Sequence, residues 1–335
     1  MQVPTLLVVV IVTALVFDFI NGFHDTANAI ATVVSTGVLR ARTAVLLAAV
    51  LNVAGAFAGT AVATTVGKDL LDPKIVTQHL VLSALVGAIV WNLITWWFGL
   101  PSSSSHALVG GLCGAALFAS GSGAIQPTGL EKILIALIFS PFFGFAAALI
   151  TMVGTFWVTR HVRPATINSV FRKLQLASAS FMAFSHGTND AQKTMGVITM
   201  ALVQFGGTYQ AGGKFQVPPW VVLACAVAMG LGTACGGWRI IHTMGQKIFK
   251  LRPIHGFCAE TSAAAVLQVA AHLGLPTSTT HCITAAIMGA GATTRLSAVS
   301  WGVTRNILWA WVLTIPMSAL VAAVCYACLS AVGLR

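Results

Sequence analysis

Two polar motifs each occur twice in this 335-residue chain, and every copy interrupts an apolar stretch. Residues 99–106 (GLPSSSSH) recur as residues 274–281 (GLPTSTTH). Residues 21–25 (NGFHD) have a counterpart in residues 186–190 (HGTND). Membrane proteins built from internal repeats form their substrate sites where interrupted helices of the two repeats meet. The duplication therefore predicts two repeats with one polar site between them.

The composition excludes an ordinary soluble domain. Hydrophobic residues make up 57% of the chain and charged residues only 7%, whereas about a quarter of a soluble domain is charged. Several apolar runs are long enough to cross a hydrocarbon core of ~30 Å as helices; they are 43–66, 130–159, 218–242 and 301–330. The sequence therefore predicts an all-α polytopic membrane protein.

The formal net charge of +11 does not indicate nucleic-acid binding. The basic residues are scattered among hydrophobic runs, whereas a nucleic-acid surface gathers them into one patch. Their position in loops between spans is what the positive-inside rule expects of a protein in the inner (plasma) membrane. The lipid bilayer, and no nucleic acid, is the expected surrounding.

We expect each half to contain three crossings, a broken helix and a re-entrant hairpin with a Ser/Thr-rich tip. The hairpins are placed at 77–121 and 256–292. Because three is odd, the second repeat is inverted relative to the first, and the basic loops place both chain termini outside the cell. The predicted organisation is a first inverted repeat (1–160), a short basic cytoplasmic connection (161–175) and a second inverted repeat (176–335).

The two hairpin tips are candidate anion sites. Pro101 and Pro276 are expected to break the entering helix of each hairpin. The hydroxyl residues that follow can cap the returning helix, whose free N–H groups and dipole favour an anion. The residues predicted to bind a tetrahedral oxyanion are Ser102, Ser103, Ser104, Ser105, Thr277, Ser278, Thr279 and Thr280. His106 and His281 end the two motifs, either as proton carriers or as donors to a neighbouring carbonyl.

The other motif pair supplies buried carboxylates. An ionisable group at membrane depth costs at least ~2.5 kcal/mol, so Asp25 and Asp190 are functional candidates. Gly22 and Gly187 allow the helix to unwind beside them, which frees backbone carbonyls for a cation.

Three further polar residues lie in or beside apolar segments. Asn28 follows Asp25 by one helical turn, and its counterpart after Asp190 is Lys193. Lys193 either pairs with Asp190 or holds an anionic substrate. Glu260 lies inside the second hairpin segment and is a further cation or proton site.

These motifs together resemble the inorganic phosphate transporter (PiT) family, in particular its bacterial low-affinity type. The segments that carry the resemblance are 22–29 (GFHDTANA), 185–193 (SHGTNDAQK) and 274–282 (GLPTSTTHC). The resemblance implies sodium- or proton-driven uptake of orthophosphate, an inverted-repeat fold and a homodimer. The transport-site residues that it implies are Asp25, Asn28, Asn189, Asp190, the hydroxyl residues of the tips and Glu260.

Two positions depart from the family pattern. His24 stands where many members have Asn, and an imidazole cannot offer the amide oxygen that a hard cation prefers. Asn52 stands where the family has a second carboxylate. Both changes favour protons, or a neutral metal–phosphate complex, over sodium.

The sequence thus predicts a non-enzymatic symporter that imports phosphate by alternating access, with no cofactor and no resident metal. Phosphate binding is assigned to the tip hydroxyls with Asn28 and Lys193. Coupling to H⁺ is assigned to Asp25, Asp190, Asn189, Glu260 and His24. The alternatives are coupling to Na⁺, co-transport of a divalent metal with phosphate, a sulfate permease on the same scaffold, an anion channel and an intramembrane hydrolase.

Overall fold

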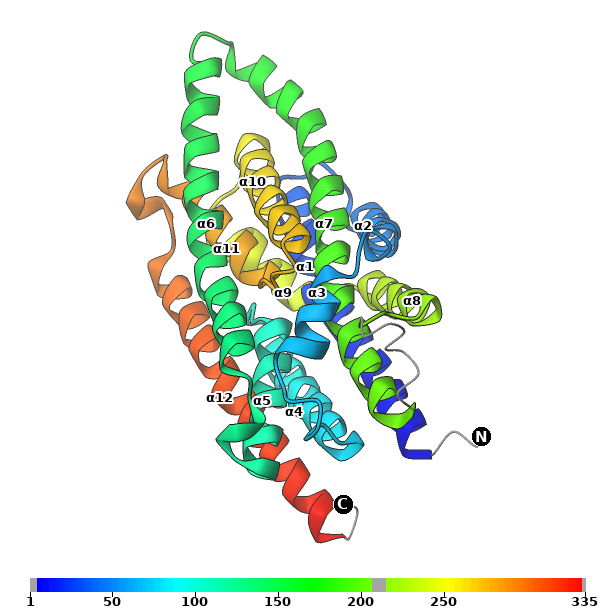
Figure 1. Cartoon of the computed structure of the whole chain (residues 1–335). Helices are drawn as coiled ribbons and strands as arrows, with labels where there is room; N and C mark the ends of the chain where they lie inside the picture. Colours follow the sequence, from blue (N-terminus) through cyan, green and yellow to red (C-terminus); the bar gives the residue numbers. More distant parts are fainter. Residues whose placement is uncertain (1–4, 207–214, 333–335) are drawn as a thin grey trace.

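The computed structural model describes residues 5–206 and 215–332, and throughout these ranges the regular elements are helices (Figure 1). The predicted positions of the two chain ends fall on residues 1–4 and 333–335, outside the described residues. The helices are α1 (Thr5–Ser35), α2 (Ala41–Ala56), α3 (Ala61–Thr64), α4 (Gln78–Trp97), α5 (Ser104–Ser120), α6 (Pro127–Thr159), α7 (Pro164–Gly206), α8 (Pro219–Cys235), α9 (Trp238–His242), α10 (Pro253–His272), α11 (Thr279–Ala292) and α12 (Trp301–Ala331).

The long apolar helices confirm the predicted all-α membrane architecture. Within the described ranges, α1, α4, α6 and α12 are each long and apolar enough to span a bilayer, and two bent helix pairs raise the number of candidate spans to six. Helices α7 and α10 are also long but are not among these candidates, and in α7 polar residues interrupt the apolar character. Its residues from Ser185 to Leu202 are buried by protein, so this helix need not be apolar toward lipid.

The predicted unwinding at Gly22 and Gly187 is wrong. Helices α1 and α7 run without a break through both glycines. A Cβ atom on Gly22 would lie 2.3 Å from the carbonyl oxygen of Met229, and one on Gly187 would lie 2.2 Å from that of Asn52. The glycines therefore permit close packing of helix backbones, as small residues do in membrane helix pairs.

Each half does contain a broken helix, but at another place. The segments on either side of the break are α2 with Ala61–Asp69, bent by 67°, and α8 with Trp238–Lys247, bent by 61°. The second break falls at Gly236, whose φ of 72° is a backbone conformation that favours glycine. From the sequence, both segments (43–66 and 218–242) are expected to cross the membrane as plain helices.

The helix–tip–helix arrangement of both predicted hairpin segments is present, formed by α4 with α5 and by α10 with α11 (Figure 1). The entering helices end at Trp97 and His272, so the prolines do not break them. The chain turns at Gly99 (φ 65°) and Gly274 (φ 66°) in the left-handed region. Pro101 and Pro276 lie further on, in the extended tip. The expectation that proline ends the helix is therefore wrong, because glycine does so first.

The predicted connection at 161–175 is mostly helical. Helix α6 ends at Thr159 and α7 begins at Pro164, so only a tight turn separates them. In Figure 1 these two helices extend beyond the rest of the molecule and meet at this turn. The domain boundaries and the inverted orientation of the halves stay predictions.

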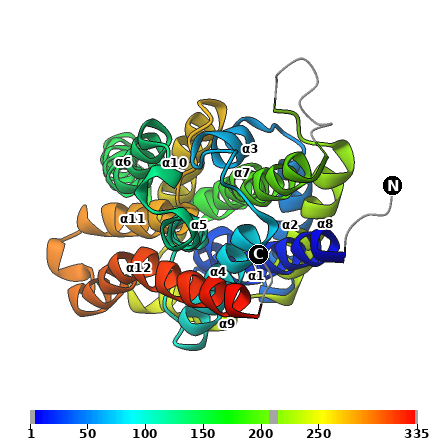
Figure 2. The ribbon, with the colours of Figure 1, turned by 60° about the horizontal axis from the view of Figure 1, so that its bottom comes forward.

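The duplication is visible in the packing of helices from different halves. Helix α1 packs on α8 and α2 packs on α7, while α5 packs on α12 and α11 packs on α6. Helices α6, α11 and α12 lie to one side of the molecule and α2 and α8 to the other (Figure 2). The polar motifs on α1, α7 and the two tips lie between these groups.

We expect Gly187→Leu to destabilise the fold. The new side chain would collide with the α2 backbone, and overpacking of this kind costs at least ~1–3 kcal/mol. Thermal unfolding of the purified protein in detergent measures the effect. Gly154→Ala on α6 is the control, because no atom lies within 4 Å of its added Cβ. Equal melting temperatures for Gly187→Leu and the wild type would contradict the close-packing role.

Candidate functional site at the two hairpin tips

The returning helices of the two hairpins begin close to each other. Ser103 caps α5 by accepting a hydrogen bond from the N–H of His106 (3.2 Å), and Ser278 caps α11 in the same way from His281 (3.1 Å). The rings of His106 and His281 lie 4.4 Å apart between centroids. Two helix N-termini thus converge, and their partial positive charges favour an anion between them.

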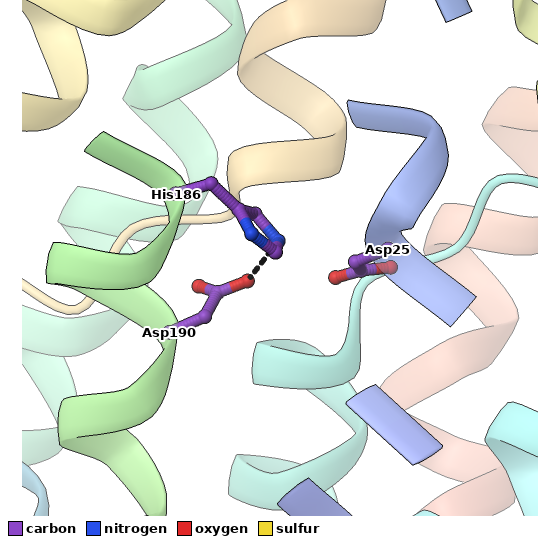
Figure 3. A group of neighbouring side chains, drawn as sticks. All are labelled: Asp25, His186 and Asp190. Atoms are coloured by element: carbon purple, nitrogen blue, oxygen red, sulfur yellow. Dashed lines mark ion pairs between the residues drawn. The ribbon is translucent and has the colours of Figure 1, made fainter. Parts of the chain in front are cut away.

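Helices α1 and α7 bring the two aspartates of the repeated motifs together. Ligand atoms of Asp25, His186 and Asp190 all lie within 4.8 Å of one another, and all three residues are buried. Figure 3 shows Asp25 on α1 facing His186 and Asp190 on α7. The sequence motifs, which are far apart in the chain, therefore form one buried cluster.

Asp25 is held by residues of its own half. Nδ1 of His24 lies 2.6 Å from Oδ1 of Asp25, and Nε2 of the same ring lies 3.1 Å from the hydroxyl of Thr95. The hydroxyl of Ser104 donates to Oδ2 of Asp25 at 3.4 Å, and that of Ser102 donates to Thr95 at 2.8 Å. The first tip and α1 are thus joined through one carboxylate and one imidazole.

Asp190 has the equivalent contact to the second tip. The hydroxyl of Thr279, the counterpart of Ser104, donates to Oδ2 of Asp190 at 2.9 Å. Nε2 of His186 lies 3.1 Å from the same oxygen. The amide of Asn189 donates to the hydroxyl of Thr277 at 2.8 Å. Each aspartate therefore contacts the tip of its own half.

The residues one turn further along each helix reach across to the other half. Asn28 donates from Nδ2 to the hydroxyls of Thr279 (3.2 Å) and Thr280 (2.9 Å). Lys193 donates to the hydroxyl of Ser105 and to the carbonyl of Thr277. The two halves are thereby linked at the site in both directions.

Lys193 also forms an ion pair with Asp190. Of the two alternatives that the sequence left open, the structure shows the pairing with Asp190. The ammonium nevertheless remains beside both tips, since Ser105 belongs to one and Thr277 to the other.

Glu260 belongs to a separate polar cluster. Its carboxylate accepts hydrogen bonds from the hydroxyls of Thr32 on α1 and Ser178 on α7, and from Nε2 of Gln175 at 3.1 Å. The residue is fully buried on α10. Three donors satisfy the carboxylate without any contact to the hairpin tips.

The sequence does not assign His186 or Thr95 to the site, and it marks Asn52 only as a departure from the family pattern. His186 and Asn21 occupy the same place in the two motifs, and this difference was the available signal for His186. Oδ1 of Asn52 accepts a hydrogen bond from Nδ1 of His186 (3.1 Å), and Nδ2 of Asn52 donates to the hydroxyl of Thr233 (2.8 Å), so Asn52 positions the imidazole. Thr95 lies in an apolar helix without any pattern that could have marked it.

The fold and the buried polar site define a polytopic membrane transporter. Residues 21–322 match the phosphate transporter family, and the chain belongs to this family. The chain is 52% identical over 322 residues to a probable low-affinity inorganic phosphate transporter of Rhizobium meliloti (strain 1021), covering 96% of each. It is 47% identical to one of Bacillus subtilis (strain 168), again covering 96% of each chain.

One solved structure has the same fold along nearly its whole length. It is described as the sodium-dependent phosphate transporter and has a TM-score of 0.88 at 25% identity, covering 98% of this chain and 99% of the other. The relatives are named as transporters. This confirms the predicted family and the prediction that the chain is not an enzyme.

We expect Ser103→Ala to lower the thermal stability of the protein. It removes the N-cap of α5, which typically costs ~1 kcal/mol. Ser120→Ala at the other end of the same helix is the matched control, since its exposed hydroxyl caps nothing. Melting in detergent measures both variants, and equal effects would argue against a specific cap.

Proposed function

We propose that the protein is a proton-coupled symporter that imports inorganic phosphate by alternating access, with phosphate bound between the two hairpin tips. The observation that carries this proposal is the convergence of two capped helix N-termini beside a buried pair of aspartates. Hydroxyl and N–H donors suit a tetrahedral oxyanion. The duplicated halves supply the two parts that such transporters rock against each other.

The two aspartates explain why phosphate must bind together with a cation or a proton. Phosphate beside the aspartates would meet the negative charge of Asp25, because Lys193 pairs, among the described residues, with Asp190 alone, and like charges repel strongly in a buried site. A cation or proton on the carboxylates removes that repulsion. Anion binding and cation binding are therefore mutually dependent, which is the requirement for symport.

The membrane potential imposes the same requirement. One charge moved against 100 mV costs ~2.3 kcal/mol, so a doubly charged phosphate entering a negative interior is opposed by ~4.6 kcal/mol. Each accompanying positive charge lowers this electrical cost by ~2.3 kcal/mol, and two such charges cancel it.

His24 favours the proton as the coupling ion. Its imidazole lies 2.6 Å from Oδ1 of Asp25 and can carry a proton within that pair. A hard cation prefers oxygen ligands, and His24 supplies none from its side chain. Sodium remains the principal alternative, since the structural neighbour is described as sodium-dependent.

The proposed setting is the inner (plasma) membrane, with a homodimer as the assembly and both termini outside. The outward faces of α6 and α12 support contact with lipid or a second copy, because their exposed side chains include Phe142, Phe143, Trp309 and Val312.

Phosphate uptake into proteoliposomes tests the proposal. We expect an inward proton gradient to drive concentrative uptake of radiolabelled phosphate, with excess sulfate having no effect. Uptake driven only by sodium would contradict the role of His24. Transport of sulfate in place of phosphate would overturn the substrate assignment, and uptake that stops at electrochemical equilibrium would indicate a channel.

A second candidate is transport of a neutral divalent metal–phosphate complex. Asp25, His186 and Asp190 offer two carboxylates and an imidazole within 4.8 Å, a ligand set that a divalent cation can accept. This alternative predicts that phosphate and a metal such as Mg²⁺ enter together. Uptake at full rate in metal-free buffer would exclude it.

We expect Asp25→Asn and Asp190→Asn each to abolish concentrative uptake while the protein still folds. An amide at position 25 cannot take up the compensating positive charge, and an amide at position 190 leaves the buried ammonium of Lys193 without its ion-pair partner. Uptake assays measure the loss of transport, and thermal melting in detergent shows whether the variants still fold. Full accumulation of phosphate by either variant would contradict the assignment.

A further inference from the structure

The ammonium of Lys193 is enclosed by oxygen atoms from three elements. It contacts Oδ1 of Asp190 on α7, the hydroxyl of Ser105 at the first tip and the carbonyl of Thr277 at the second tip (3.0 Å). Lys193 is only 2% exposed. A carboxylate, a hydroxyl and a peptide carbonyl are the ligands that a hard cation takes in proteins. The ammonium thus lies where a free cation would find its ligands.

The matching place in the first half holds no cationic side chain. Asn28 occupies it, and the Oδ1 atom of Asn28 is buried without a hydrogen-bond partner among the described residues. Oδ1 of Asn21, one turn before Asp25 on the same helix face, is likewise unpartnered within those ranges. In the described parts of the chain, Asp25 forms an ion pair with His24 and with no lysine or arginine. The first half therefore presents oxygen atoms that lack a fixed positive charge.

The charge balance of the site requires one mobile cation or proton in addition to Lys193. The two carboxylates are held within 4.8 Å of each other in a buried cluster. Lys193 balances the charge of Asp190 permanently, because it is part of the chain. Asp25 is the carboxylate that remains to be balanced by a cation or a proton, with the latter shared with His24.

We propose that Lys193 is a tethered replacement for the second coupling cation, so that the aspartate pair takes up one coupling ion per cycle, at Asp25. This inference rests on the proposed symport function and deepens it. A tethered ammonium can shield phosphate from Asp190 in every cycle, but it is not transported and adds nothing to the driving force. Lys193 is thus a residue that sets the stoichiometry of coupling.

The first test replaces Lys193 by the residue that its counterpart carries. In proteoliposomes with an imposed phosphate gradient and the membrane potential held at zero, the opposing cation gradient that stops net flux gives the number of cations moved per phosphate. We expect Lys193→Asn to raise this number by one, since Asp190 then needs a free cation too. Lys173→Asn is the control, because it removes an exposed lysine from the same helix and should leave the ratio unchanged.

The converse variant tests the same idea from the first half. Asn28→Lys places a tethered cation beside Asp25 as well, so we expect the ratio to fall by one. Any exchange of internal for external phosphate by this variant should no longer require a free cation, because both carboxylates are then shielded by tethered charges.

An unchanged ratio in an active Lys193→Asn variant would overturn the proposal. If Lys193→Asn shows neither net flux nor phosphate exchange, the Asn28→Lys variant decides. An unchanged ratio in that variant overturns the proposal equally. A wild-type protein that carries no phosphate would instead defeat the proposed function, so the two failures are distinguishable.

Discussion

The repulsion between two buried carboxylates is the constraint on which the site depends. Asp25 and Asp190 come from different halves, yet their ligand atoms lie within 4.8 Å. At that separation two unit charges repel by at least ~3 kcal/mol, even at an effective dielectric constant of about 20. The hydroxyls of Ser104 and Thr279, the two imidazoles and Lys193 all point at these carboxylates. The arrangement of the hairpin tips follows from the need to satisfy this charge.

The helix N-termini at the tips contribute partial positive charge to the site, opposite in sign to the charge of the carboxylates. Ser103 and Ser278 each use their hydroxyl for one N–H of the first turn, and the other free N–H groups give the positive end of the helix dipole. Negative side chains and positive helix ends therefore meet in one volume. In the proposed symport, an anion and a cation both bind there, and each strengthens the binding of the other.

The duplicated motifs predicted the site far better than they predicted the backbone around it. Similar polar segments in two halves indicate that the segments meet, and the contacts between Asp190 and Thr279 and between Asn28 and Thr280 agree with this. Glycine was ambiguous, because unwinding and close packing both require it. Only the neighbouring helix showed that Gly187 serves close packing. Thr95 and the separate setting of Glu260 depend on tertiary contacts that no local pattern records.

The glycine contacts also show which pairs of helices are held rigidly together. Gly22 on α1 lies against the backbone of α8, and Gly55 on α2 lies against that of α7, with no side chain between them. Helices that touch through backbone have no flexible layer along which to slide, and such packed interfaces resist continuous deformation. The pairs α1–α8 and α2–α7 therefore behave as rigid units. In the proposed alternating-access cycle, the movement that exposes the site to either side of the membrane would then occur where side chains separate the helices, between these pairs and the hairpins that pack on α6 and α12.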